Sequence, residues 1–156
     1  ASCAAAYPMC TAFGTLHPYA ENVEADFQQL RSLQLRGVKL HPDFQNFPID
    51  DPRAYPMYEM IQSSGLPILM HMGDAKSDFS HPYRLAMILR QFPKLRIIAA
   101  HFGGWGQWKE ANAILQAAVR YQQQPAVFAA GGDSKAAVPL RGRELLLWRR
   151  LPHVGL

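Results

Sequence analysis

Residues 67–73 read Pro-Ile-Leu-Met-His-Met-Gly, and residues 97–104 read Ile-Ile-Ala-Ala-His-Phe-Gly-Gly. Each stretch is an apolar run of strand length that ends in a histidine and continues into a loop that contains glycine. Parallel α/β proteins build their sites at the carboxyl ends of strands. A histidine at such a position can bind a metal or transfer a proton, and a nearby glycine lets a ligand approach the main chain.

The same succession of an apolar run and an amphipathic stretch repeats along most of the chain. We predict strands over residues 12–16, 38–41, 67–71 and 96–100, and helices over residues 22–34 and 53–64, from residue 82 onward, and over 105–119. Strands that alternate with helices indicate α/β architecture with a parallel sheet. Four such βα units make about half of a (β/α)8 TIM barrel, or most of a small doubly wound sheet.

This pattern stops after Gln124, so we divide the chain into a partial barrel at residues 1–124 and an irregular basic tail at residues 125–156. The formal charge of +4 comes from the end of the chain. Residues 1–133 hold 11 basic and 11 acidic side chains, whereas residues 134–156 hold five basic side chains and one acidic. A basic tail can bind phosphate groups, but we interpret these few charges as incidental and expect no nucleic-acid partner.

The composition indicates in which cellular compartment the protein is expected. Charges or prolines interrupt every apolar run before it reaches the length of a membrane span, so we expect no membrane partner. The first residues are small and mildly apolar but lack the basic start of a signal peptide. Cys3 and Cys10 are the two cysteines, too few for a disulfide framework. We therefore expect a cytoplasmic protein.

Four side chains are candidates for chemistry. His71 and His101 occupy equivalent positions in successive units, which favours metal ligation or acid–base catalysis over two unrelated core histidines. Lys39 and His41 lie on one face of the strand at residues 38–41, because side chains alternate along a strand. Either of them could contact a substrate. The alternative is that Lys39 extends to solvent and His41 fills a turn before Pro42.

Other polar and aromatic residues near the predicted strand ends are interpreted as structural. We expect His17 to support the first unit and His81 to cap a helix or pack in its loop. Solvated loop acids are expected at Asp74 and Asp78. Trp105 and Trp108, about one helical turn apart, are expected to pack against the rest of the chain.

The two histidine stretches lie in a longer string that resembles the amidohydrolase-related family of metal-dependent (β/α)8-barrel hydrolases and decarboxylases. The string includes FGTLHP at residues 13–18 and GVKLHPDFQ at residues 37–45, and it covers roughly residues 1–118. The resemblance implies a divalent metal, usually zinc, with His71 as a metal ligand. It also implies that His101 acts near the metal, on the substrate or on the proton of a bound water.

The chain differs from the family pattern in two respects. The family's first strand ends in a His-x-His pair, and its last strand ends in a metal-binding aspartate; neither motif occurs in this sequence. Read one base later, codons for residues 139–156 can encode a segment similar to the aspartate motif. We therefore hypothesise that the tail is a frameshift product, which the nucleotide sequence would test directly.

The leading interpretation is a fragment of an amidohydrolase-type enzyme, a hydrolase or lyase acting on a small-molecule substrate. Its chemistry would be metal-dependent hydrolysis of a C–N or C–O bond, or decarboxylation of a small organic acid. Because catalytic zinc normally has three protein ligands, we expect this chain alone to be inactive and to bind zinc weakly. The alternatives are a non-catalytic binding or scaffold module, an inactive truncated chain, and a homo-oligomer in which a second copy completes the barrel.

Overall fold

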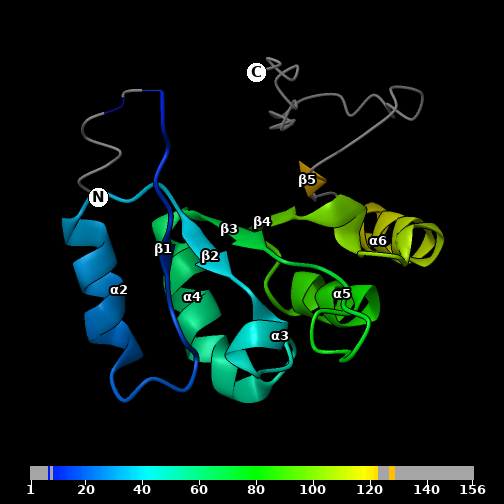
Figure 1. Cartoon of the computed structure of the whole chain (residues 1–156), viewed down its shortest axis with the longest axis horizontal. Coiled ribbons are helices and arrows are strands. Elements are labelled where there is room, and N and C mark those ends of the chain that lie inside the picture. Colours follow the sequence, from blue (N-terminus) through cyan, green and yellow to red (C-terminus); the bar gives the residue numbers. More distant parts are fainter. Residues whose placement is uncertain (1–6, 8, 123–126, 129–156) are drawn as a thin grey trace, which may run out of the picture.

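Five parallel strands form one sheet in the order β1-β2-β3-β4-β5, in a computed structural model that describes Tyr7, residues 9–122 and residues 127–128 (Figure 1). The strands are β1 (Gly14–Thr15), β2 (Val38–Leu40), β3 (Pro67–Met70), β4 (Arg96–Ala99) and β5 (Val127–Phe128). A doubly wound sheet reverses its strand order at a switch point, whereas a barrel keeps sequence order. The consecutive order therefore decides between the two predicted architectures, and the fold is a partial (β/α)8 barrel.

Helices connect the strands and cover one face of the sheet (Figure 1). The four longer helices are α2 (Val23–Ser32), α4 (Tyr55–Ser64), α5 (Pro82–Gln91) and α6 (Trp108–Gln122). Three short helical turns are α3 (Pro42–Gln45), η1 (Pro52–Ala54) and η2 (His101–Gly103). None of the helices within the described residues is both long and apolar enough to cross a membrane.

Burial alternates along the strands and separates the two faces of the sheet. Side chains that face the helices are almost fully buried, and they include Val38, Leu40, Ile68, Met70, Ile97 and Ala99. On the opposite face, the strand register places three side chains in a row across the sheet. Lys39 aligns with Leu69, and Leu69 aligns with Ile98. These three side chains are half-buried. This second face corresponds to the interior of a barrel, and Lys39 is the charged residue in the row.

Local sequence signals explain most helix ends. Asn22 caps α2, with its Oδ1 accepting a hydrogen bond from the Ala25 amide at 2.9 Å. Gly65 ends α4 in the left-handed conformation, with φ of 71°. Pro82 occupies the first turn of α5. These three boundaries agree with the helices predicted to begin at residue 22, to end at residue 64 and to begin at residue 82.

The structure differs from the predicted elements in several places. The first four strands each end one residue before the predicted boundary, so His41 and His71 follow their strands rather than terminate them. The predicted loop after β2 contains the short helix α3, and α6 begins at Trp108 instead of residue 105. Strand β5 pairs with β4 through Ile98↔Val127, in a segment where the sequence predicted no element. The remainder of the proposed tail, residues 129–156, lies outside the described residues.

A buried tyrosine joins α4 to the loop that follows α3. Tyr58 is fully buried, and its hydroxyl donates a hydrogen bond of 2.9 Å to the Ile49 carbonyl oxygen. Ile49 is itself buried in the same core. The hydrogen bond satisfies two polar groups that have no access to water.

Replacing Tyr58 by phenylalanine should lower the free energy of unfolding by about 1–2 kcal/mol, because the Ile49 carbonyl would lose its buried partner. Urea denaturation of the full chain measures this change. Tyr83→Phe is the matched control, since the Tyr83 hydroxyl contacts Asp78 at the surface. The control should cost less than about 0.5 kcal/mol. Equal losses in both variants would contradict the interpretation.

Candidate functional site at the carboxyl ends of the strands

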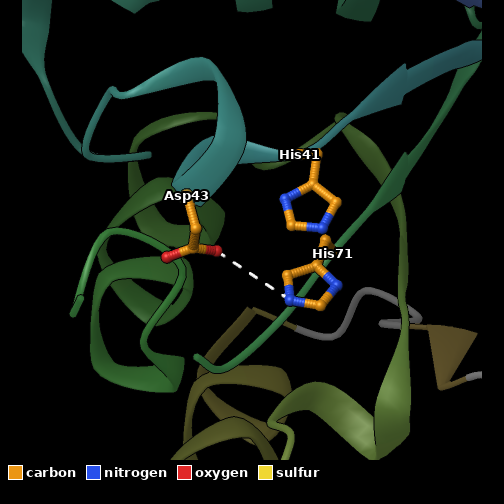
Figure 2. A group of neighbouring side chains, drawn as sticks. All are labelled: His41, Asp43 and His71. Carbon is orange, nitrogen blue, oxygen red and sulfur yellow. Dashed lines mark ion pairs between the residues drawn. The ribbon is translucent and has the colours of Figure 1, made fainter. Parts of the chain in front are cut away.

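His41, His71 and His101 meet at the carboxyl edge of the sheet. The rings of His41 and His71 are stacked, with centroids 3.9 Å apart and planes 10° from parallel (Figure 2). His101 approaches His71 edge-on, with ring centroids 4.9 Å apart. The structure therefore brings together the three histidines that follow β2, β3 and β4.

His71 is fixed by its own loop. Its Nε2 lies 2.9 Å from the Gly73 carbonyl oxygen. Because a carbonyl oxygen only accepts hydrogen bonds, Nε2 carries the proton and Nδ1 keeps its lone pair. Burial lowers the pKa of His71 below its usual range, and the positive forms of His41 and His101 would lower it further. The ring is therefore neutral near pH 7, the state in which histidine binds metals.

His101 occupies a strained turn. His101 and Phe102 both have φ of 55°, in the left-handed region, and Gly103 follows with φ of 80°. Non-glycine residues in this region cost of order 1–3 kcal/mol each and tend to cluster at functional sites. Burial, followed by the charge of Lys39, lowers the pKa of His101. Within the described residues, neither ring nitrogen of His101 has a hydrogen-bond partner, so both are open to a ligand.

His41 has structural contacts as well as a place in the cluster. Its Nδ1 accepts a long hydrogen bond of 3.4 Å from the Phe44 amide at the start of α3. Its ring also stacks on Phe44, with centroids 3.9 Å apart. Burial lowers the pKa of His41, and the charge of Lys39 lowers it further.

Lys39 contributes positive charge to the same region. It projects from the middle of β2 on the face of the sheet that is away from the helices. Burial lowers the pKa of its ammonium group. Among the described residues it makes no hydrogen bond or ion pair. A half-buried cation without a protein partner is well suited to meet an anionic group of a ligand.

Asp43 is a member of the site that the sequence analysis missed. Its carboxylate Oδ2 lies 3.9 Å from His71 Nε2, and its side chain is only 4% exposed (Figure 2). It belongs to α3, which lies in the segment predicted to be a loop. The available signal was spacing, since Asp43 follows His41 by two residues directly after a buried strand.

His41, Asp43 and His71 offer ligand atoms that all lie within 4.8 Å of one another. Two neutral imidazoles and a carboxylate are the types of ligand that bind a divalent ion such as zinc. A zinc–nitrogen bond of about 2 Å lies close to the ring plane, however. The nearly parallel rings of His41 and His71 do not aim their lone pairs at one common point. The group therefore offers suitable ligand types for a divalent ion without forming a complete set of three ligands.

The other polar side chains near the strand ends have structural partners. His17 Nε2 contacts the Gln45 carbonyl oxygen at 2.9 Å, while its Nδ1 accepts a hydrogen bond from the Tyr19 amide. His81 caps α5 through the Tyr83 amide. These contacts agree with the predicted structural roles of both histidines.

The two loop acids keep access to solvent, as expected, and each also has polar partners nearby. Asp74 accepts hydrogen bonds from two amides of its own loop, and Asp78 pairs with Arg84 at 2.7 Å. Trp105 and Trp108, which were expected to pack against the rest of the chain, are both more than half exposed. Trp105 instead contacts the ring of His101, with centroids 5.0 Å apart.

The consecutive parallel sheet with histidines at its carboxyl edge is that of a partial (β/α)8 barrel. The family profile described as Amidohydrolase matches residues 1–145, and the chain belongs to this family. Comparison with curated proteins gives no sequence match.

Solved structures share the fold. An uncharacterized TIM-barrel protein, Bb4693 from Bordetella bronchiseptica, is 23% identical with a TM-score of 0.68; the alignment covers 82% of this chain and 46% of that one. The 5-carboxyvanillate decarboxylase LigW from Sphingomonas paucimobilis is 20% identical with a TM-score of 0.57, covering 82% and 50%. A protein described as amidohydrolase II is 16% identical with a TM-score of 0.55, covering 84% and 53%. The chain thus spans about half the length of each.

Gly73 is expected to be intolerant of any side chain. Its φ is 77°, and a Cβ at this position would overlap the main-chain nitrogen of Trp105. Gly65 is a matched control, because it has a similar φ of 71° and no atom lies within 4 Å of the point that its Cβ would occupy. Gly65→Ala should cost about 1–2 kcal/mol, the penalty for the left-handed conformation alone.

Gly73→Ala should cost clearly more than Gly65→Ala, because steric overlap adds to the conformational penalty. Chemical denaturation of both variants and the parent chain gives the comparison. A Gly73→Ala variant as stable as Gly65→Ala would show that the two loops do not pack as closely as described.

Proposed function

We propose that this chain carries part of the active site of a metal-dependent amidohydrolase-type enzyme. The reaction is hydrolysis of a C–N or C–O bond, or decarboxylation, of a small organic acid. The observation that carries the proposal is the convergence of His41, His71 and His101 at the carboxyl edge of the sheet. Membership of the amidohydrolase family, together with the fold shared with a decarboxylase, supports it.

In this proposal each candidate has one role. His71 binds the metal, zinc, through Nδ1, because its Nε2 is engaged by Gly73. When bound, the metal would polarise the substrate and activate water. His101 is the acid–base group, since its neutral ring has a free nitrogen that can accept a proton. Lys39 and His41 contact the substrate, with the ammonium of Lys39 facing an anionic group.

We further propose a cytoplasmic location, because the chain carries only two cysteines and Cys10 is free and exposed. The substrate is a small molecule that enters at the carboxyl edge of the sheet, as in other barrels of this kind.

Zinc binding by the full chain is expected to be weak. The described residues present one well-placed ligand, so the free energy of binding should fall well below the roughly 10–16 kcal/mol of structural zinc sites. Isothermal titration calorimetry with zinc measures it. His71→Ala should abolish the binding, whereas His81→Gln, which alters a helix cap, should leave it unchanged. Tight, stoichiometric zinc, or binding that survives His71→Ala, would contradict the assignment.

The role of Lys39 is tested with benzoate as a simple carboxylate probe. Lys39→Met removes the charge but keeps much of the apolar stem, so the affinity for benzoate should fall about tenfold. Chemical-shift titration of the labelled chain gives the dissociation constants. Lys76→Met, in the exposed loop after β3, is the control and should bind benzoate like the parent chain. Equal affinity in the Lys39 variant would remove Lys39 from the substrate site.

A further inference from the structure

Asp43 is a buried carboxylate held by two hydroxyl groups. Ser77 donates a hydrogen bond to its Oδ1 and Ser80 donates one to its Oδ2, each at 2.5 Å. Ser80 is fully buried and the Asp43 side chain is 4% exposed. Within the described residues, His71 is the one basic group within 4 Å of this carboxylate. Burying a charge with so little compensation is costly, so the position calls for a functional reason.

The serines connect Asp43 to the loop between β3 and α5, the same loop that holds His71. The Gly73 amide donates a hydrogen bond of 3.0 Å to the Ser80 carbonyl oxygen. The Gly73 carbonyl oxygen in turn accepts from His71 Nε2 at 2.9 Å. A continuous path of hydrogen bonds therefore runs from the carboxylate of Asp43, through Ser80 and Gly73, to the imidazole of His71.

The charge of Asp43 favours the same tautomer of His71 as these hydrogen bonds do. The Asp43 Oδ2 atom lies 3.9 Å from His71 Nε2, on the side of the ring that faces Gly73. A negative charge there favours a proton on Nε2 and disfavours a lone pair on that nitrogen. When Nε2 carries the proton, Nδ1 is the nitrogen that remains available for coordination. Partners of this kind fix the tautomer and orientation of metal-binding histidines in other proteins.

We propose that Asp43 is a positioning residue for His71. Its carboxylate fastens the loop after β3 through Ser77 and Ser80, and its charge holds the imidazole of His71 in the Nε2–H tautomer. His71 thereby presents Nδ1 to the site. The use of that nitrogen for a metal rests on the proposed function, whereas the tautomer and the loop anchor are properties of the metal-free chain.

The test is a nuclear magnetic resonance measurement on the full chain labelled with ¹⁵N-histidine, with a chelator present. At about pH 8, above the ordinary histidine pKa of about 6.5, the ring nitrogen shifts report which tautomer is populated. Comparison with His71→Asn assigns the His71 signals. We expect the parent chain to show His71 almost entirely as the Nε2–H tautomer.

Asp43→Asn keeps the shape of the side chain but removes its charge. The population of the Nδ1–H tautomer of His71 should then rise about threefold or more. Ser80→Ala keeps the charge but frees one carboxylate oxygen, so it should shift the tautomer in the same direction. Asp78→Asn is the control, since Asp78 belongs to the same loop but pairs with Arg84, and the His71 tautomer should not change.

The following results would overturn the inference that Asp43 positions His71. An Nδ1–H tautomer in the parent chain overturns the inference, even if Asp43→Asn fails to fold. An unchanged tautomer in folded Asp43→Asn or Ser80→Ala also overturns it. Because no metal or substrate is present, these results are independent of the proposed enzyme. If the parent chain shows the Nε2–H tautomer of His71 but binds no zinc, the proposed metal at His71 is rejected. The role of Asp43 is then unaffected.

Discussion

The register of the parallel strands is the constraint on which the site depends. The His71 amide donates a hydrogen bond of 3.0 Å to the Leu40 carbonyl oxygen, and the Ala100 amide donates one of 2.9 Å to the Met70 carbonyl oxygen. These bonds extend the ladder one residue beyond β3 and β4 and keep the three strand ends level. Side chains at one level of neighbouring strands lie on the same face, so His41 must lie beside His71. A slip of one residue would move either ring to the opposite face.

The sequence predicted the parts of this arrangement that follow from local patterns. Apolar runs of strand length that end in a histidine identified the edge where His71 and His101 lie, and amphipathic stretches predicted the helices that begin near Asn22 and end before Gly65. The family resemblance, based on the same residues, is confirmed by the profile match. Strand β5 was not predicted because Val127–Phe128 is too short to show a period of its own and is defined by pairing with β4.

The parts that the sequence did not reveal depend on contacts between distant segments. Asp43 meets Ser77 and Ser80 more than thirty residues later, so no local pattern marks it as buried. The tryptophans were expected to pack against the rest of the chain, about one helical turn apart. The structure instead begins α6 at Trp108, and Trp105 lies before the helix with its ring against His101. In both cases a tertiary contact, rather than residue type, decides the environment.

The close approach at Gly73 joins two loops into one mechanical unit. The Trp105 amide donates a hydrogen bond of 2.8 Å to the Met72 carbonyl oxygen, and the space where a Cβ of Gly73 would lie is filled by the Trp105 main chain. The loop after β3 therefore cannot shift without moving the segment that precedes α6. The exposed Trp105 ring, whose edge lies against His101, is thus attached to the same packed main chain as the Gly73 carbonyl that contacts His71. One set of main-chain contacts therefore holds an exposed aromatic ring and two of the site's imidazoles in place.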